Sequence, residues 1–315
     1  MTDAAVRASA AKTRPTQQVV EVSAGVARSA DAVVVTCDSG AIVGEAVAAL
    51  LRDPAVDRVI IVDHRSRGAH RELLAAIERE QSDRVEVVWQ DRNPGFAAGV
   101  NEGLRRVRRP FAAIVNPDCV VDRGAVESLV DAMNAAPRAG IAGGTVLDRN
   151  GREQAGSRRE LPRRRDAFLR RLGLRGPRWD FNHAGRPMPA GPVEVPAVSG
   201  ALMLVRSSAI SAVGPLDERF VLHFEDLEWC ARMRRSGFAV LFVPEASGRH
   251  LKGTSAARRP LFACYHKHRS LLLFDRLQVG SRWQQRSHAL FAIAVWSGFL
   301  IAAPIELIAS RVRRR

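Results

Sequence analysis

Short apolar runs rich in β-branched residues alternate with stretches of helical pattern along the first 135 residues of the chain. Short strands separated by helices are typical of a parallel sheet, because parallel neighbours need a long crossover connection. We therefore predict an α/β fold with a mostly parallel central sheet and helices on both faces. The predicted strands are Ala32–Thr36, Arg58–Val62, Val85–Trp89 and Phe111–Val115, and the predicted helices are Val43–Leu51, Gly95–Val107 and Gly124–Asn134.

Acidic and histidine side chains stand where apolar runs give way to polar residues. Asp63 follows the second predicted strand, Asp118 follows the fourth, the pair Glu225-Asp226 comes later, and His250 lies beyond a further apolar run. In open α/β sheets, ligands bind at the carboxyl ends of the strands. We expect these side chains to share one metal-assisted site.

The tripeptide Asn116-Pro117-Asp118 marks the end of the fourth strand. Pro117 cannot donate to a sheet ladder, so the strand stops there and presents Asp118 at its end. A carboxylate in that place suits a hard cation such as Mg²⁺ or Mn²⁺. Taken alone, the same tripeptide is also a common turn.

Five further short motifs accompany this tripeptide in a fixed order. The six segments are Asn93–Asn101, Asn116–Asp118, Ser199–Ala201, Gly214–Phe220, Phe224–Asp226 and His250–Ser255. With them, residues 32 to 275 resemble the family 2 inverting glycosyltransferases of the GT-A fold, and within these the rhamnosyltransferase-like branch. The late segment from Ala289 onward adds an apolar helical appendage to that fold.

The resemblance implies a role for each matching residue. Asp118 and His250 would hold Mg²⁺ or Mn²⁺, Asp226 would take the proton of the acceptor hydroxyl, and Glu225 would contact the acceptor or support the site. The expected donor-binding residues are Thr36, Asp38, Asp63, Ser66, Asn93, Gly95, Phe96, Gly99, Asn101, Asn116, Asp118, Lys252, Thr254 and Ser255, and the expected acceptor-binding residues are Ser199, Gly200, Glu225 and Trp229.

Two positions depart from the family pattern. The chain has Asp63-His64-Arg65-Ser66 where the family usually has Asp-Asn-x-Ser, and Thr36-Cys37-Asp38 where it usually has Thr-Tyr-Asn. Asp63 and Ser66 are retained, so a base or ribose contact is still expected there. The changes leave open whether the donor is linked to dTDP or to UDP.

Three of these residues have a plainer interpretation. A single histidine such as His250 is commonly structural. Asp226 is also placed to act as an acid that stabilises a helix N-terminus. Trp229, one helical turn further on, fits a core position as well as the wall of an acceptor site.

The net charge of +15 favours a polyanionic partner. Nine arginines lie between Arg158 and Arg178, in a segment that also reads as a solvated basic loop. No nucleic-acid module or aromatic platform accompanies it, so nucleic acid is not the expected partner. An anionic membrane surface or a diphospholipid acceptor fits better.

The C-terminal segment supports membrane association. Ala289 to Ile308 is apolar with Glu306 as its one charged residue, and Arg311 and three further arginines at 313–315 follow. Twenty helical residues reach about 30 Å, enough to cross a bilayer core. Pro304 and Glu306 disfavour a regular span, so a spanning helix, an interfacial helix and a buried core helix all remain open.

These features divide the chain into consecutive regions. A disordered tail without a secretory signal is expected at 1–30, and the four widely spaced cysteines favour a reducing compartment. The expected glycosyltransferase domain, 31–280, comprises a nucleotide-sugar-binding half at 31–147, a basic insert at 148–192, an acceptor and catalytic half at 193–257, and an amphipathic helix at 258–280. A membrane-associating helix and basic tail occupy 281–315.

The leading functional hypothesis is a metal-dependent inverting glycosyltransferase of cell-envelope glycan synthesis. It would transfer a sugar, L-rhamnose from dTDP-rhamnose being one candidate, to a lipid-linked or polysaccharide acceptor at the cytoplasmic face of the plasma membrane, held there peripherally or by one C-terminal span. A nucleotidylyltransferase shares the sheet, but the chain has no glycine-rich activation loop near its first strand. A catalytically silent glycan- or membrane-binding scaffold would be expected to lack the acidic residues.

Overall fold

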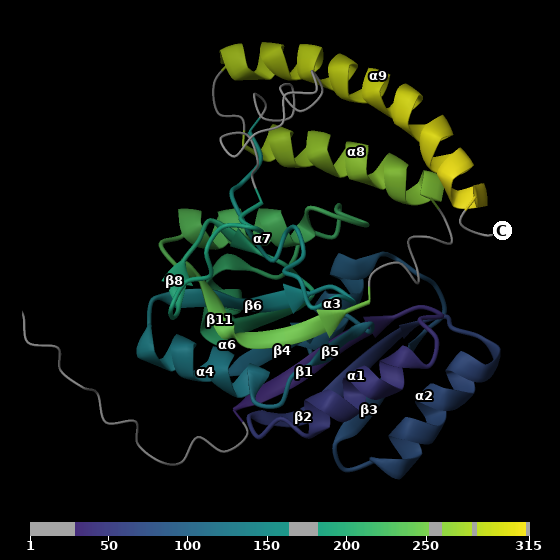
Figure 1. Ribbon diagram of the computed structural model, residues 1–315, viewed down its shortest axis with the longest axis vertical. Coiled ribbons are helices and arrows are strands. Elements are labelled where there is room, and N and C mark those ends of the chain that lie inside the picture. Colours follow the sequence, from purple (N-terminus) through teal and green to yellow (C-terminus); the bar gives the residue numbers. More distant parts are fainter. Residues whose placement is uncertain (1–28, 164–181, 252–259, 279–281, 313–315) are drawn as a thin grey trace, which may run out of the picture.

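The computed structural model describes residues 29–163, 182–251, 260–278 and 282–312 (Figure 1). The N-terminal tail up to residue 28 and the middle of the basic insert, 164–181, lie outside these residues, so the predictions for them stay predictions. The described residues form a central sheet with helices packed against it. Two long helices, α8 (Pro260–Leu277) and α9 (Arg282–Val312), lie outside this body.

The first half of the sheet is parallel, as predicted. Its strands follow the spatial order β3-β2-β1-β4, and each neighbouring pair in this group is parallel. Their bounds are β1 (Ala30–Thr36), β2 (Val56–His64), β3 (Val85–Gln90) and β4 (Phe111–Val115), with α1 (Ile42–Leu51), α2 (Gly68–Glu80) and α3 (Phe96–Leu104) between them. Because all four strands run the same way, their carboxyl ends meet at one edge.

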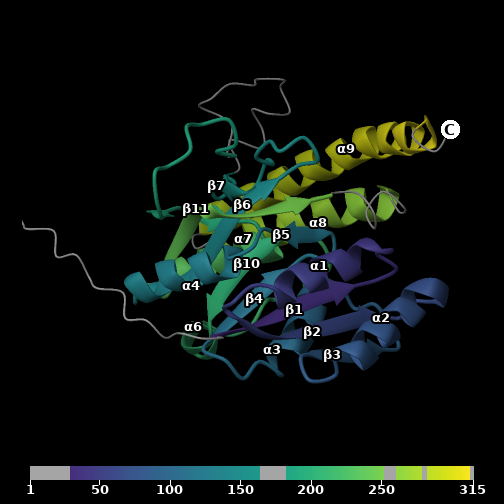
Figure 2. The ribbon, with the colours of Figure 1, turned by 60° about the horizontal axis from the view of Figure 1, so that its bottom comes forward.

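The second half of the sheet is mixed (Figure 2). β10 (Leu202–Arg206) is antiparallel to both β4 and β6 (Ala139–Leu147), and β11 (Ala239–His250) is parallel to β6. The short strands β5 (Cys119–Val121) and β8 (Val193–Glu194) add antiparallel pairs to β11, and β7 (Arg158–Arg159) pairs with β9 (Ala197–Val198) in a second small sheet. The predicted parallel arrangement is therefore limited to the first four strands and the β6–β11 pair.

Helices cover both faces of the sheet, because successive strand residues point to opposite sides. Val34 and Ile61 face one hydrophobic cluster, whereas their neighbours Val33 and Ile60 face another. The first cluster contains residues of α1, α2 and α4 (Ala125–Ala135), and the second contains residues of α3, α6 (Ser207–Val213) and α7 (Glu225–Arg235). The core therefore lies in two layers, one on each side of the sheet.

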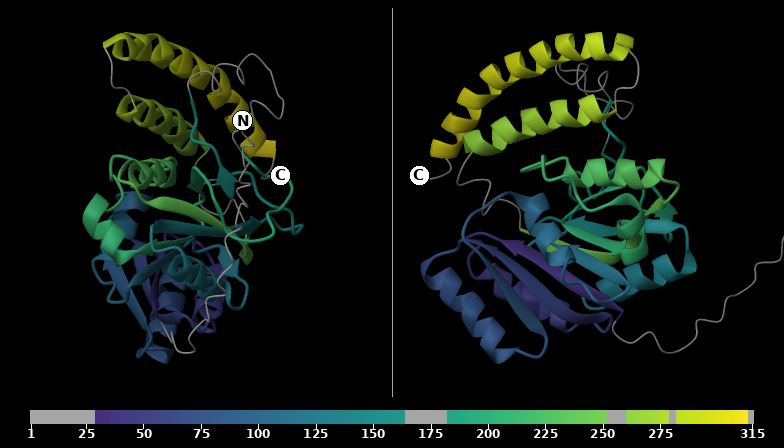
Figure 3. Two further views of the ribbon diagram at one scale, coloured as in Figure 1. Left: turned by 90° about the vertical axis from the view of Figure 1, so that its left-hand side faces the viewer. Right: turned by 180° about the vertical axis from the view of Figure 1, so that it is seen from behind.

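Helix α8 lies between α9 and the α7 side of the body (Figure 3). The ring centroids of Phe224 and Phe274 are 5.8 Å apart, and Ser270 donates a 3.0 Å hydrogen bond to the Leu222 carbonyl. Helix α9 in turn packs on α8 through aromatic contacts, such as Tyr265 with Trp296 at 5.6 Å between centroids. The two helices are thus anchored on the loop that precedes α7.

The outer face of α9 is apolar and exposed. Leu290 and Leu300 are each 72% exposed, and Ile293 and Ile301 also face outward. The alternative of a buried core helix is therefore wrong, because α9 has too little of the protein packed around it. Ser287–Pro304 is long and apolar enough to cross a membrane by length and composition, which is weak evidence by itself.

Candidate functional site

Backbone strain in the described residues is concentrated in three loops. The four non-glycine residues with positive φ there are Asp38, Arg65, His223 and Phe224. Such conformations cost on the order of 1–3 kcal/mol each and cluster at functional sites. Asp38 and Arg65 follow β1 and β2, whereas His223 and Phe224 directly precede the acidic pair at the start of α7. All three loops are therefore candidate parts of one site.

The loops after β1 and β2 are joined by hydrogen bonds between predicted donor-binding residues. The Asp38 backbone N–H donates to Ser66 Oγ at 2.8 Å, and the Ser66 N–H donates to Asp63 Oδ2 at 2.9 Å. Asp63 is fully buried, and its Oδ1 has no hydrogen-bond partner within the described residues. A buried carboxylate oxygen without a donor is costly to keep. Asp63 Oδ1 is therefore an acceptor that a ligand N–H or O–H can satisfy.

Thr36 and His64 occupy supporting positions instead. Thr36 is only 1% exposed, and its hydroxyl contacts Ser39 and His70, so it supports the loop after β1 from inside the protein, and its donor contact stays a prediction. His64 is also buried, and burial lowers the pKa of its imidazole, which keeps it neutral. A Cβ on Gly99 would lie 2.7 Å from the His64 ring. His64 is therefore held in the packing between β2 and α3.

The Asn93–Asn101 segment acts mainly through packing. Asn93 Oδ1 accepts the Gly95 N–H at 3.1 Å, and Gly95 has φ of 110° with the Val221 carbonyl 2.8 Å from where a Cβ would be. Gly99 lets α3 approach β1, since a Cβ there would lie 2.6 Å from Val35 Cγ1. These glycines are thus explained by contacts with the protein itself.

The prediction that Asn101 binds the donor is wrong. Its side chain donates to the Leu216 carbonyl and to Glu218, each at 2.9 Å, and accepts the Leu216 N–H at 3.0 Å. It is 3% exposed. Asn101 therefore fixes the loop between α6 and α7 to α3. Phe96, at the start of α3, is half-buried, with its ring 3.9 Å from a Cβ built on Gly200, and so remains next to the site.

Asp118, Asn116 and His250 meet at the end of β11. His250 Nε2 lies 3.0 Å from Asp118 Oδ1 and 3.2 Å from Asn116 Nδ2. Asp118 and His250 are 7% and 8% exposed. β5 directly follows the tripeptide, and its pairing with β11 sets Cys119 opposite His250. The predicted metal-binding pair is therefore assembled from two distant parts of the sequence.

Gln154 orients the His250 ring. Gln154 Oε1 lies 3.2 Å from His250 Nδ1, and Gln154 Nε2 donates to the His250 carbonyl at 2.6 Å. A histidine that binds a metal through one nitrogen normally has the other held in this way. In the described part of the chain, three or more His, Cys, Asp or Glu residues do not gather into one metal-binding group. This pair fits a divalent cation that takes its other ligands from a bound substrate.

The acidic pair lies in the first turn of α7. Glu225 is 9% exposed, and burial together with the neighbouring Asp226 charge raises the pKa of Glu225 to about 8. Glu225 Oε2 has no hydrogen-bond partner among the residues that the structure describes. Asp226 Oδ2 instead accepts the Gly200 N–H at 3.2 Å, and Oδ1 accepts the Leu227 N–H at 2.8 Å. The two adjacent acids thus have very different surroundings.

Arg159 is a member of this site that the sequence did not reveal. Its Nη2 donates to Asp226 Oδ2, and its side chain is 17% exposed. The neighbouring Arg158 is 4% exposed and paired with Glu153 at 2.9 Å. The first two arginines of the arginine-rich segment from Arg158 to Arg178 are therefore part of the folded body and not of a solvated loop, which is a correction. A charge count along the sequence does not separate them from surface arginines.

The Ser199–Ala201 segment connects the metal-binding pair with the acids. The Asn116 N–H donates to the Ala201 carbonyl at 3.1 Å, and the Gly200 N–H donates to Asp226. Trp229 does not reach this space: it is fully buried and its indole N–H donates to the Gly214 carbonyl at 3.0 Å. The prediction that Trp229 contacts an acceptor is therefore wrong, and its core alternative is correct.

Lys252, Thr254 and Ser255 are outside the described residues, so their predicted donor contacts stay predictions.

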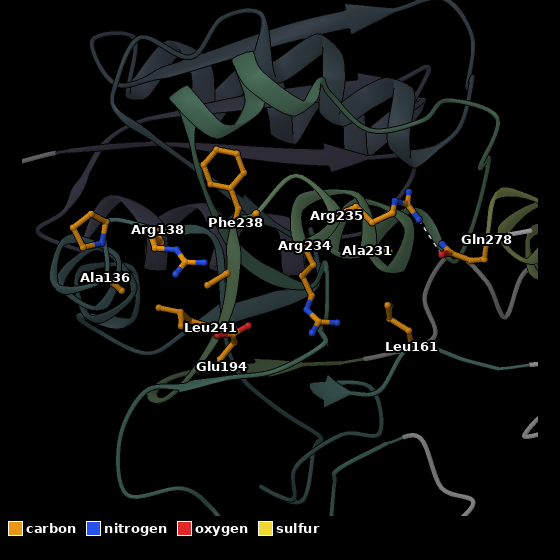
Figure 4. A pocket seen from close by; sticks show the side chains of 13 residues that line it. Ala136, Arg138, Leu161, Glu194, Ala231, Arg234, Arg235, Phe238, Leu241 and Gln278 are labelled. Atoms are coloured by element: carbon orange, nitrogen blue, oxygen red, sulfur yellow. Dashed lines mark hydrogen bonds between the residues drawn. The ribbon is translucent and has the colours of Figure 1, made fainter. Parts of the chain in front are cut away.

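A hollow of about 690 Å³ is lined by Arg138, Arg234 and others at the far end of α7 (Figure 4). The lining residues on α7 are Ala231, Arg234 and Arg235, which lie about 8 to 14 Å along the helix from Asp226. The hollow is therefore not the site described above.

Residues 29–270 match the family model described as "Glycosyltransferase like family 2". The chain is 29% identical over 217 residues to an N-acetylglucosaminyl-diphospho-decaprenol L-rhamnosyltransferase of Mycobacterium tuberculosis, covering 64% of this chain and 70% of that protein. The matched region includes the whole site as it is described here, from Asp38 to His250.

Solved structures resemble the fold at low sequence identity. A mannosyltransferase of Pyrobaculum calidifontis, in complex with GDP-Man and Mn²⁺, matches with a TM-score of 0.56 and 14% identity over 90% of this chain and 73% of its own. GalNAc-T7 with UDP, GalNAc and Mn²⁺ matches with a TM-score of 0.56 and 15% identity over 71% of this chain and 43% of its own. These similarities concern the fold alone.

Proposed function

The chain belongs to the glycosyltransferase-like family 2, and from that premise we propose that it is a metal-dependent inverting hexosyltransferase acting on a lipid-linked acceptor. The GT-A fold and the glycosyltransferase class are confirmed. The nucleotidylyltransferase and the silent scaffold are thereby set aside. The donor sugar, the acceptor, the metal and the membrane location belong to the proposal.

One observation carries the proposal: a single segment joins a metal-binding pair to a buried acidic pair. Asn116, beside Asp118 and His250, is bonded to Ala201, and the adjacent Gly200 is bonded to Asp226. A sugar transfer needs a cation where charge develops on the leaving diphosphate and a base where the acceptor hydroxyl attacks. The contacts of Ser199–Ala201 with both pairs support a site in which the cation and the base lie close together.

Asp118 and His250 are the residues that would hold the cation. When bound, it supplies electrostatic stabilisation of the leaving diphosphate. An imidazole next to a carboxylate suits Mn²⁺ better than Mg²⁺, which prefers oxygen ligands and retains water. Two relatives in fold, the mannosyltransferase and GalNAc-T7, were solved with Mn²⁺, which supports the same choice.

Asp226 is proposed as the base. With a pKa of about 8, Glu225 is mostly protonated at pH 7 and cannot accept a proton there. Asp226 is ion-paired with Arg159 and remains partly accessible, its side chain being 14% exposed. In a single displacement, the acceptor oxygen forms its bond to the anomeric carbon as the bond to the diphosphate breaks, and the hydroxyl proton passes to Asp226.

The donor is proposed to be a dTDP- or UDP-linked sugar. Asp63 Oδ1 is a buried acceptor in need of a donor, and the imide N–H of thymine or uracil supplies one. The similarity to an L-rhamnosyltransferase favours dTDP-L-rhamnose as the first compound to test. Ser66 bonds to both Asp63 and Asp38, so it keeps this loop in place.

The acceptor is proposed to be a saccharide on a polyprenyl diphosphate at the cytoplasmic face of the plasma membrane. The mycobacterial relative is named for such a lipid-linked substrate. The exposed apolar face of α9 and the arginines that follow it fit an anionic bilayer surface. Such an enzyme would act in the synthesis of cell-envelope glycans.

A donor screen tests this proposal directly. The full chain is incubated with Mn²⁺, a set of dTDP-, UDP- and GDP-sugars, and membrane extract as acceptor, and transfer of radiolabelled sugar to lipid is measured. We expect transfer from a dTDP- or UDP-sugar that stops with excess EDTA. Transfer that continues undiminished in EDTA contradicts the metal-dependent part, and transfer from no donor contradicts the whole.

A further inference from the structure

The acidic pair shares one nearby cation. Arg159 Nη2 contacts Asp226 Oδ2, and its positive charge also acts on Glu225, where it partly offsets the effect of burial. Arg159 Nε is buried and has no hydrogen-bond partner in the described part of the chain. Burying a guanidinium N–H that has no acceptor costs free energy. That Arg159 is buried here all the same indicates that its position serves a function.

The position of Arg159 is built by the fold. In β7, Arg158 pairs with Val198 and Arg159 with Ala197, directly before the Ser199–Ala201 segment. Successive strand residues point to opposite sides, and Arg158 is held on one side by Glu153 and by the carbonyls of residues 186 and 187. Arg159 is consequently directed to the other side, toward Asp226.

This contact decides which oxygen of Asp226 is open. Each carboxylate oxygen has two lone pairs. Oδ2 already accepts from Arg159 and from the Gly200 N–H, whereas Oδ1 accepts from the Leu227 N–H alone within the described residues. Oδ1 therefore has a lone pair left for the acceptor hydroxyl.

We propose that Arg159 is the positioning residue of this site: its contact with Asp226 Oδ2 holds the carboxylate turned so that Oδ1 meets the acceptor hydroxyl. This inference rests on the proposed function, because it assigns Asp226 as the base. Arg159 acts through Asp226 and does not itself bond to the reacting atoms.

The charged and titratable groups around Asp226 define the expected pH effect. Arg159 on β7 is paired with Asp226, Glu225 precedes Asp226 on α7, and Cys230, one turn further on, is influenced by Asp226, Arg159 and Arg234. Burial raises the pKa of Cys230 to about 12, so it stays a neutral thiol. The segment carrying Gly200 and the Phe96 ring adds no charge to this side. Among the described residues, Arg159 is thus the cation in direct contact with Asp226, and its removal is the change to test.

The test compares Arg159→Met with Arg163→Met in the full chain. Arg163 is exposed four residues further on, so its variant removes the same charge without touching Asp226. We expect Arg159→Met to lower kcat about 10- to 100-fold, a part of the contribution of a well-placed base. The donor KM should stay unchanged, and the acidic limb of the kcat/KM profile should move to higher pH, because a carboxylate without its cation binds a proton more tightly. Arg159→Lys retains the positive charge, so the acidic limb of its kcat/KM profile should stay close to that of the unchanged chain.

Two results overturn the inference. One is an Arg159→Met enzyme whose kcat and acidic limb match those of the unchanged chain. The other is a loss that is the same at every pH and follows the loss of folded protein, which indicates a structural role. If the unchanged chain transfers no sugar, the proposed function fails instead. A ¹³C NMR titration of the carboxyl groups, assigned with Asp226→Asn, then still decides whether removing Arg159 shifts the titration of Asp226.

Discussion

Replacing Glu225 with glutamine should change how the stability of the protein depends on pH. The pKa of Glu225 is raised by burial from 4.5 to about 8, so the folded state binds its proton more tightly than the unfolded state does. Protonation of Glu225 therefore contributes stability to the folded state that is fully present below pH 4.5 and is lost as the pH rises toward 8. Each pH unit in this window corresponds to ~1.4 kcal/mol, which makes the loss by pH 7 about 3 kcal/mol.

Glutamine resembles the protonated acid and does not titrate, so the variant lacks this loss. Denaturant unfolding of both proteins between pH 5 and pH 8 measures the difference in free energy of unfolding. We expect the free energy of unfolding of Glu225→Gln to increase steadily with pH relative to that of the unchanged chain. Glu72→Gln, an exposed position on α2, should differ from the unchanged chain by the same amount at every pH. A difference for Glu225→Gln that is flat with pH would refute the assignment of a neutral, buried Glu225. Transfer at pH 7 should be nearly normal in this variant.

Asp226→Asn should keep donor binding but lower turnover roughly 100-fold to 10,000-fold, since an amide cannot take the proton of the acceptor; a nearly normal rate, measured as sugar transfer, would mean that another group is the base. Asp118→Asn and His250→Ala should raise the Mn²⁺ concentration needed for half-maximal transfer, and an unchanged requirement in His250→Ala would show that His250 is structural. A chain ending before Arg282 should be released from anionic liposomes at high salt, while the full chain stays bound through the apolar face of α9; equal binding of the two in sedimentation would exclude α9 as the membrane contact.

Strands β1 to β4 and the polar residues at their carboxyl ends could be predicted from the sequence. Buried parallel strands are read as continuous β-branched runs, and β1 and β2 both show this pattern. Parallel strands also bring their carboxyl ends to one edge. Asp63 and Asp118 could therefore be expected at the same edge of the sheet from the sequence alone.

Strand β6 could not be predicted in the same way, because it is rich in glycine and alanine. A Cβ on Gly143 would lie 2.5 Å from Val198 Cβ, and one on Gly144 would lie 2.4 Å from the Ala246 carbonyl oxygen. Neighbouring segments thus require glycine at these places. The same requirement removes the β-branched residues by which a strand is recognised.

Side-chain roles within a motif were less predictable than the motif itself. Asn101 belongs to a matching segment and Trp229 follows another by three residues, yet both are buried and bonded to the loop between α6 and α7. Arg159 was missed for the opposite reason, because it stands in an arginine-rich stretch and meets Asp226 only through tertiary contacts. Spacing along the chain does not show which way a polar side chain turns.

The anomeric configuration of the product tests the central claim most directly. The full chain, with Mn²⁺ and the best donor of the screen, is given a short polyprenyl-diphosphate saccharide as acceptor, and the new glycosidic linkage is identified by NMR. Direct attack with Asp226 as the base predicts a linkage of opposite anomeric configuration to the donor, and no such product from Asp226→Asn. A product that retains the donor configuration, or release of free sugar in place of transfer, would contradict the account.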